Sequence, residues 1–92
     1  MRQDEAELVA VSALAWLAGN DSLLPVFLGA TGASGESIRT GVQDPVFLGS
    51  VLDFVLMDDA WIMALCDDAG LGYDVPGRAR AALPGGNVPT WT

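Results

Sequence analysis

The segment from Leu8 to Leu17 predicts a helix that is apolar on every side. Because successive residues of an α-helix are about 100° apart, its large side chains point in all directions around the axis. The segment holds six of these, with alanines and one serine in the gaps or just after: Leu8, Val9, Val11, Leu14, Trp16 and Leu17, then Ala10, Ala13, Ala15 and Ala18, and Ser12. A helix that is apolar all round is normally buried, and this one is shorter than the about 20 residues that cross a bilayer. We therefore expect the rest of the chain, or a second copy of it, to surround this helix.

Helix-capping signals along the chain predict five or six short helices. The expected starts share an Asp or Ser side chain that can accept a backbone N–H: Asp4, Asp21 or Ser22, Ser34, Asp44 before Pro45, Asp58 with Asp59, and Asp74 before Val75-Pro76. The expected ends fall at glycine or proline residues: Gly19, Gly32, Gly41, Gly70 and Pro84. No stretch alternates with a period of two over the length of a strand. The sequence therefore predicts an all-α fold.

Residues 45–69 allow two interpretations. In the favoured one, Asp58-Asp59 separates two helices; in the other, a single helix runs from Pro45 to Ala69. The first part of this region is expected to carry large apolar residues on one side and a polar strip on the other. The residues of that strip are Gly49, Ser50 and Asp53.

The length and composition predict a single domain over residues 1–92. A chain of 92 residues can build one core but not two, and its 51% apolar content is high for a globular domain. We expect a compact orthogonal bundle of five or six short helices around the central N-terminal helix. Residues 1–3 and 87–92 are expected to be flexible or docking ends.

The charge of the chain argues against several classes of partner. Twelve acidic residues face four arginines, with no lysine and no histidine, and the net charge is −8. Nucleic-acid binding depends on Lys and Arg side chains that neutralise phosphates, and anionic membranes attract basic segments. We therefore expect neither a nucleic acid nor a membrane as partner. The acidic surface either keeps the protein in solution or receives a basic protein partner.

The amino terminus does not resemble a secretory signal peptide, because Arg2 is followed at once by Asp4, Glu5 and Glu7. A cytoplasmic location is the corresponding expectation. Cys66 is the single cysteine, so the chain has no internal disulfide, and its apolar neighbours predict a buried, unreactive thiol. Because the chain has no histidine or lysine to act as a base for a nucleophile, we expect neither enzymatic activity nor a cofactor.

Two pairs of carboxylates deserve a separate interpretation. Asp58 and Asp59 lie where a helix is expected to start, so helix capping is the simplest role for them. Asp67 and Asp68 lie near the expected end of the same helix, where the helix dipole disfavours acids. Such a local conflict can mark a binding surface. Neither pair has the ligand spacing of a calcium loop.

The three tryptophans have different expectations. Trp16 belongs to the apolar N-terminal helix and is expected in the core. Trp61 fits either core packing or an anchor at the rim of an interface. Trp91 lies in the tail rich in Pro and Gly, and either folds back onto the bundle or docks on a partner.

Several short motifs resemble a family of short alphaproteobacterial proteins catalogued as a domain of unknown function. They are Phe27-Leu28 with Thr31-Gly32, Asp44-Pro45-Val46-Phe47-Leu48 running into Val51-Leu52-Asp53-Phe54, Asp58-Asp59-Ala60, and Ala79-Arg80-Ala81-Ala82-Leu83-Pro84-Gly85. The resemblance covers nearly the whole chain and implies a helical fold and a cytoplasmic bacterial origin, with no activity. A second, local resemblance covers Leu24 to Asp58, which is similar to the three-helix bundle of ubiquitin-associated domains and implies a trihelical unit in the middle.

The sequence thus predicts a small non-catalytic module for protein interaction or regulation, which acts either alone or as a homodimer. Its expected partner surface consists of Asp58, Asp59, Trp61, Asp67, Asp68 and Trp91. The alternative is a helical bundle that binds a metal ion or a small molecule through the two Asp pairs.

Overall fold

Six α-helices follow one another along residues 1–84, the part of the chain that the computed structural model describes. They are α1 (Gln3–Ala18), α2 (Leu24–Thr31), α3 (Gly35–Gly41), α4 (Pro45–Val55), α5 (Asp59–Ala69) and α6 (Val75–Ala82). No strand occurs in this range, so the predicted all-α class is confirmed. Two helices, α4 and α5, occupy residues 45–69, which excludes the single long helix. Gln3, placed in the amino-terminal end by the sequence, already belongs to α1.

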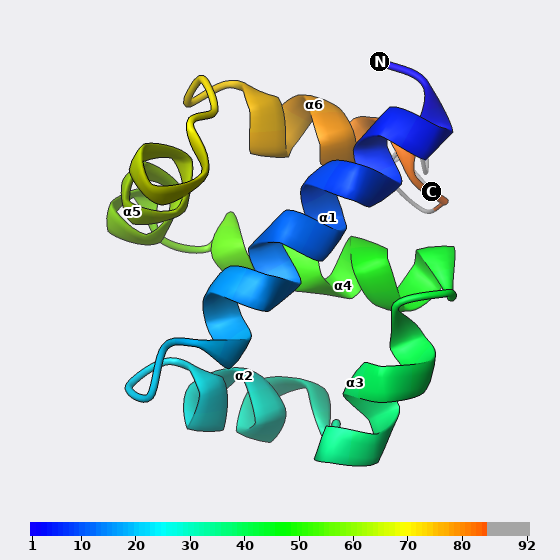
Figure 1. Cartoon of the computed structure of the whole chain (residues 1–92), viewed down its shortest axis with the longest axis vertical. Coiled ribbons are helices and arrows are strands. Elements are labelled where there is room, and N and C mark those ends of the chain that lie inside the picture. Colours follow the sequence, from blue (N-terminus) through cyan, green and yellow to red (C-terminus); the bar gives the residue numbers. More distant parts are fainter. Residues whose placement is uncertain (85–92) are drawn as a thin grey trace, which may run out of the picture.

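The N-terminal helix is the centre of the bundle, as predicted. Figure 1 shows α1 running diagonally across α4, with α6 and α2 near its two ends. It packs most extensively against α6 and α4, and also contacts α5 and α2. The face that it turns to them is made of Ala6, Ala10, Ala13 and Leu17, all with no exposed surface, and of the buried Leu14. Because three of these side chains are single methyl groups, the neighbouring helices can approach the α1 backbone closely.

Enclosure of α1 on every side, however, is a wrong prediction. Leu8 is 70% exposed and Val11 37% exposed, and both lie opposite the alanine face. Leu14 is buried as expected, whereas Val9 and Trp16 are half-buried against the core. The physical reason is geometric: the other five helices have only 7 to 11 residues each and gather on the alanine side. The composition of α1 could not show which of its apolar sides stays open.

The core is built mainly on α4. This helix buries Leu48, Val51, Leu52, Phe54 and Val55, and they pack with residues of α1, α2, α5 and α6. An aromatic cluster links three helices within it. The Phe27 ring of α2 meets the Phe54 ring edge-on, with centroids 5.3 Å apart, and Trp61 of α5 stacks on the other side of the cluster at 4.8 Å from Phe54.

Three of the predicted helix starts are confirmed by their hydrogen bonds. The side chain of Ser34 accepts from the Ser37 N–H, that of Asp44 from the Val46 N–H at 3.0 Å, and that of Asp58 from the Ala60 N–H at 2.8 Å. The predicted ends are also found. Gly32 and Gly70 follow α2 and α5 in the left-handed conformation, both at φ 72°, which favours glycine.

The predicted caps of α1 and α2 are wrong. Helix α1 begins one residue before Asp4, and the Asp4 carboxylate instead pairs with Arg2 at 2.9 Å. Neither Asp21 nor Ser22 caps α2, whose N-cap residue is Leu23; the side chain that binds the backbone of this loop belongs to Asn20. Its Oδ1 accepts the backbone N–H groups of Ser22 and Leu23, both at 3.1 Å, and the helix starts only at Leu24.

The start of α6 is found where the sequence predicts it, although no side chain caps it with a hydrogen bond. Asp74 precedes the helix, but its side chain makes no capping hydrogen bond and lies 3.4 Å from Arg78 instead. Pro76 still occupies the first turn, where a missing N–H is tolerated. The helix start therefore depends more on the proline than on the carboxylate.

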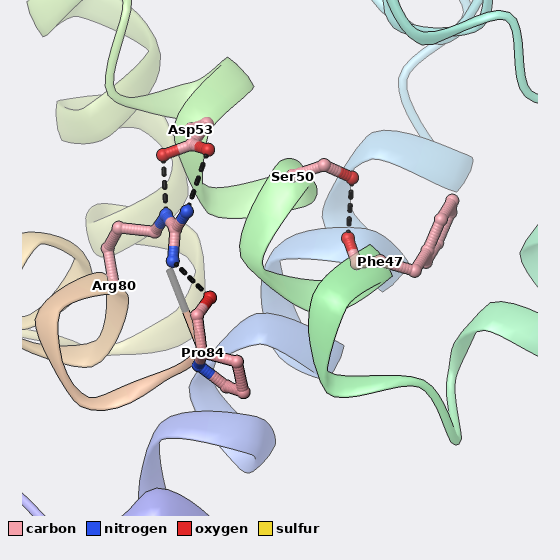
Figure 2. Close-up of polar contacts among 5 residues, drawn as sticks. All are labelled: Phe47, Ser50, Asp53, Arg80 and Pro84. Carbon is pink, nitrogen blue, oxygen red and sulfur yellow. Dashed lines mark hydrogen bonds and ion pairs between the residues drawn. The ribbon is translucent and has the colours of Figure 1, made fainter. Parts of the chain in front are cut away.

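The polar strip expected on α4 is occupied by an arginine of α6. Figure 2 shows the Arg80 guanidinium donating to both oxygens of Asp53, at 2.5 and 3.1 Å, and to the Pro84 carbonyl oxygen at 3.1 Å. Gly49, expected in the strip, is buried beneath this guanidinium. The interaction fastens α6 to α4, and the side chain of Arg80 is only 19% exposed.

The middle of the chain does not stand apart from its flanks. Helix α4 packs more extensively against α1 and α6 than against α3, so the three helices α2, α3 and α4 share their core with the rest of the bundle. None of the helices within residues 1–84 combines the length and the apolar content that spanning a membrane requires.

Candidate functional site

The two pairs of carboxylates lie at opposite ends of α5. Asp58 and Asp59 stand at its start, and Asp67 and Asp68 lie in its last turn. At a rise of about 1.5 Å per residue, nine residues of helix hold the pairs about 13 Å apart. The structure therefore does not bring the predicted partner residues together into one site.

The start of α5 is occupied by structural contacts. Asp58 caps the helix, and Asp59 lies in the first turn, where the helix dipole favours an acid. Trp61 follows them, and its half-buried ring stacks on Phe54 at an interplanar angle of 18°. Of the two roles considered for Trp61, the structure shows core packing.

Asp67 is engaged by the only tyrosine of the chain. The Tyr73 O–H donates to Asp67 Oδ1 at 2.8 Å, and this hydrogen bond, together with the Asp67 charge, raises the pKa of the phenol. Tyr73 and Asp67 also line a shallow hollow of about 320 Å³ with Leu71 and Gly72. These contacts fold the α5–α6 connection back onto the end of α5.

Cys66 lies beneath this connection and is buried, with 1% of its surface exposed. Its Sγ donates to the Gly72 carbonyl oxygen at 3.4 Å. Burial, and then the charges of Asp67 and Asp74, raise the pKa of the thiol. A raised pKa disfavours the nucleophilic thiolate, in agreement with the buried, unreactive thiol predicted from the sequence.

Asp68 faces a different part of the molecule. It lines a hollow of about 400 Å³ together with Ala15, Trp16, Gly19, Asn20 and Asp21. We call this hollow the Trp16 pocket. It joins the last turn of α1, the α1–α2 loop and the last turn of α5, which lie on the same side of the molecule in Figure 1.

Two residues of the Trp16 pocket, Trp16 and Asp21, were not predicted as site residues from the sequence. Trp16 was assigned to the core and Asp21 to a helix cap. The structure shows Trp16 packed against the core and also lining the pocket. No local signal links Asp21 to Asp68, because the two lie far apart along the chain and meet only when α1 and α5 pack together.

The Trp16 pocket is electronegative. Asp21 and Asp68 are both exposed, and within residues 1–84 neither carboxylate has a hydrogen bond or ion pair with another side chain. Helices α1 and α5 both end at the pocket, and neither has a basic residue in its last turn. The C-terminal ends of helices carry partial negative charge, so the helix ends and the two carboxylates both make the electrostatic potential of the pocket more negative.

The arginines of the chain do not neutralise this pocket. Three of them pair with carboxylates elsewhere: Arg2 with Asp4, Arg78 with Asp74 and Arg80 with Asp53. The fourth, Arg39, belongs to α3, which lies across the molecule from α5 in Figure 1. The lining of the pocket contains no basic side chain.

The two remaining predictions about the site concern metal binding and Trp91. Among residues 1–84, no three His, Cys, Asp or Glu side chains are grouped as a metal ion would require. Trp91 and the whole segment 87–92 lie outside the described residues.

The fold and the surface together define a small all-helical protein whose charged side chains are all outside the core. A family model described as "Protein of unknown function (DUF3572)" matches residues 3–86, and the chain belongs to that family. Searches of curated proteins and of solved structures found no match.

Proposed function

We propose that this protein is a non-catalytic interaction module of the cytoplasm that binds a basic protein partner. The observation that carries the proposal is the distribution of charge. All twelve acidic residues lie within residues 1–84, none of them is buried, and three of the four arginines are already paired within the chain. A surface with such an excess of carboxylates attracts positively charged partners and steers their approach.

The chemistry of the side chains supports a binding role over a catalytic one. The chain has no histidine and no lysine, and its one thiol is buried with a raised pKa. Two of the acids at helix starts, Asp44 and Asp58, serve the fold as helix caps. The alternative of metal or small-molecule binding through the two Asp pairs gains no supporting observation, because the pairs lie at opposite ends of α5.

The proposal is tested by affinity capture from an extract of the source organism with the tagged full chain, at low and at high salt. Attraction between exposed charges weakens as salt screens it, so we expect a basic protein to be retained at low salt and released at high salt. A variant with Asp59→Asn, Asp67→Asn and Asp68→Asn, which removes three charges and no helix-capping hydrogen bond, should retain less of it. Capture that ignores both salt and these substitutions would contradict the proposal.

Self-association through the open face of α1 is a second part of the proposal. Leu8 and Val11 are exposed there beside Ala15 and Ala18, which are exposed as well. A second copy placed against this face would complete the burial that the sequence of α1 predicts. Sedimentation at micromolar concentration is expected to give the mass of a dimer, and Leu8→Glu to reduce it to that of a monomer. Met57→Glu, at a residue that is 74% exposed between α4 and α5, is the matched control; a wild-type monomer would contradict this part.

A further inference from the structure

We propose that the Trp16 pocket receives an arginine side chain of the basic partner. This inference rests on the proposed function and assigns its point of contact. The pocket, of about 400 Å³, is far larger than a single metal ion needs, and its lining includes an aromatic residue and two carboxylates.

The wall of the pocket is a tryptophan with a fixed position. Trp16 is half-buried: it packs against the buried core residues, and it is also among the residues that line the pocket. A ring held in this way has lost its side-chain freedom on folding, so a ligand that stacks on it does not have to order it. Cations bind to the faces of aromatic rings, and tryptophan is the strongest of these partners.

The charge around that ring favours a cation. Asp21 and Asp68 reach the pocket from two different elements, and within residues 1–84 no other side chain hydrogen-bonds to either carboxylate. The C-terminal ends of α1 and α5 add negative potential at the same place. A bound cation would thus gain two ion pairs and two favourable helix ends without displacing an existing arginine.

The Trp16 ring and the two carboxylates together favour a guanidinium group over other cations. A divalent metal ion needs several oxygen ligands close together, whereas this pocket offers two separate carboxylates and an aromatic wall. A guanidinium is planar, can stack on an indole and donates hydrogen bonds in its plane to carboxylates on its edges. An ammonium group is a more strongly hydrated point charge and cannot stack as a plane.

The experiment uses a short acetylated and amidated peptide with one arginine between glycines, and two matched peptides with lysine or with uncharged citrulline at that position. Binding to the full chain is followed by two-dimensional amide NMR. We expect the arginine peptide to shift the resonances of Trp16, Gly19, Asn20 and Asp68 and to bind at least about threefold more tightly than the lysine peptide. The citrulline peptide, which has the same shape but no charge, is expected not to bind.

Three variants with the same change of charge locate the contact. Asp68→Asn and Asp21→Asn are each expected to weaken the arginine peptide about threefold to fivefold, in line with exposed ion pairs of up to about 1 kcal/mol. Asp59→Asn, at the far end of α5, is the control and should change the affinity less than about twofold. Equal effects of the three variants, or equal binding of the lysine peptide, would overturn the pocket as an arginine site.

The outcomes separate this inference from the proposed function. If a basic protein is captured in a salt-dependent way but Asp68→Asn behaves like Asp59→Asn, the interaction role stands and the pocket is not its contact. If no basic protein is captured while the arginine peptide binds at the pocket, the pocket stands and the proposed partner class is wrong. If both experiments are negative, both proposals fall.

Discussion

The hydrogen bond from Tyr73 to Asp67 should be visible in the titration of the phenol. Because the phenolate would lose this bond and lie beside a carboxylate, the pKa of Tyr73 is raised in the folded protein. Asp67→Asn removes the charge, so the pKa should fall towards its ordinary value. Tyr73 is the only tyrosine, so an ultraviolet absorbance titration reads it directly. Asp68→Asn is the control, and an unchanged titration in Asp67→Asn would contradict the contact.

The effect of Gly49→Ala on the free energy of unfolding is expected to depend on Arg80. Alanine in a helix interior is more favourable than glycine by about 1 kcal/mol, but a Cβ here would lie 3.0 Å from Nη1 and 3.2 Å from Cζ of Arg80. The guanidinium cannot move freely, because Asp53 and Pro84 hold it. Gly49→Ala should therefore stabilise the Arg80→Ala variant more than the wild type, by at least about 1 kcal/mol.

A double-mutant cycle with denaturant unfolding of the wild type, both single variants and the double variant measures this coupling. Arg80→Ala alone is expected to destabilise the protein, because it leaves α6 without its ion pair to α4. The same effect of Gly49→Ala in both backgrounds would show that the guanidinium does not lie over Gly49 in solution.

Among the elements, α3 and α4 meet at a position where only glycine fits. A Cβ on Gly41 would overlap the ring of Phe47, which itself packs near Phe27. Overpacking of a core contact costs about 1–3 kcal/mol, so Gly41→Ala should lower the free energy of unfolding by that amount. The control is Gly29→Ala in α2, where a Cβ meets no atom within 4 Å; it should stabilise by up to about 1 kcal/mol. Denaturant unfolding of both variants makes the comparison, and equal effects would contradict the contact.

The boundaries of the helices are the part of the structure that the sequence predicted best. Caps and glycine ends depend on residues within a few positions of each other, as with Ser34 and Ser37 or Asp58 and Ala60. The failures are also local. Asp21 and Ser22 were good cap residues by type, but the side chain of Asn20, one residue before Asp21, accepts the backbone N–H groups of Ser22 and Leu23. Composition alone does not decide between neighbouring residues that compete for one role.

For the whole molecule, the contacts between helices that are far apart in the sequence could not be predicted. The aromatic cluster, the pair between Arg80 and Asp53, and the Trp16 pocket each join helices that are separated along the chain. The sequence predicted Asp68 as a partner residue on the basis of its unfavourable place at a helix end. It could not identify Trp16 and Asp21 as its neighbours, because that depends on how α5 packs against α1.

The single cysteine should report the opening of the entire bundle. Cys66 is buried and its thiol has a raised pKa, so a disulfide reagent at neutral pH should react far more slowly with the folded protein than with the unfolded chain. The rate should rise with denaturant in parallel with unfolding, and it should increase with pH as the thiolate forms. Measurement of the released thiolate dye tests this. Rapid reaction of the native protein would show that the α5–α6 connection opens on its own.

The alanine face of α1 has a consequence for how this fold can vary. Helix α1 is separated from its neighbours only by the methyl side chains of Ala6, Ala10 and Ala13, which are fully buried. A larger side chain at any of them would clash with the neighbouring helices. Because a helix is rigid, the whole of α1 would have to tilt to relieve the clash. On the opposite side of α1, Leu8 and Val11 are exposed within the single chain. Substitutions on that outward side leave the packing of the fold unchanged and act on the contacts that α1 makes with a partner.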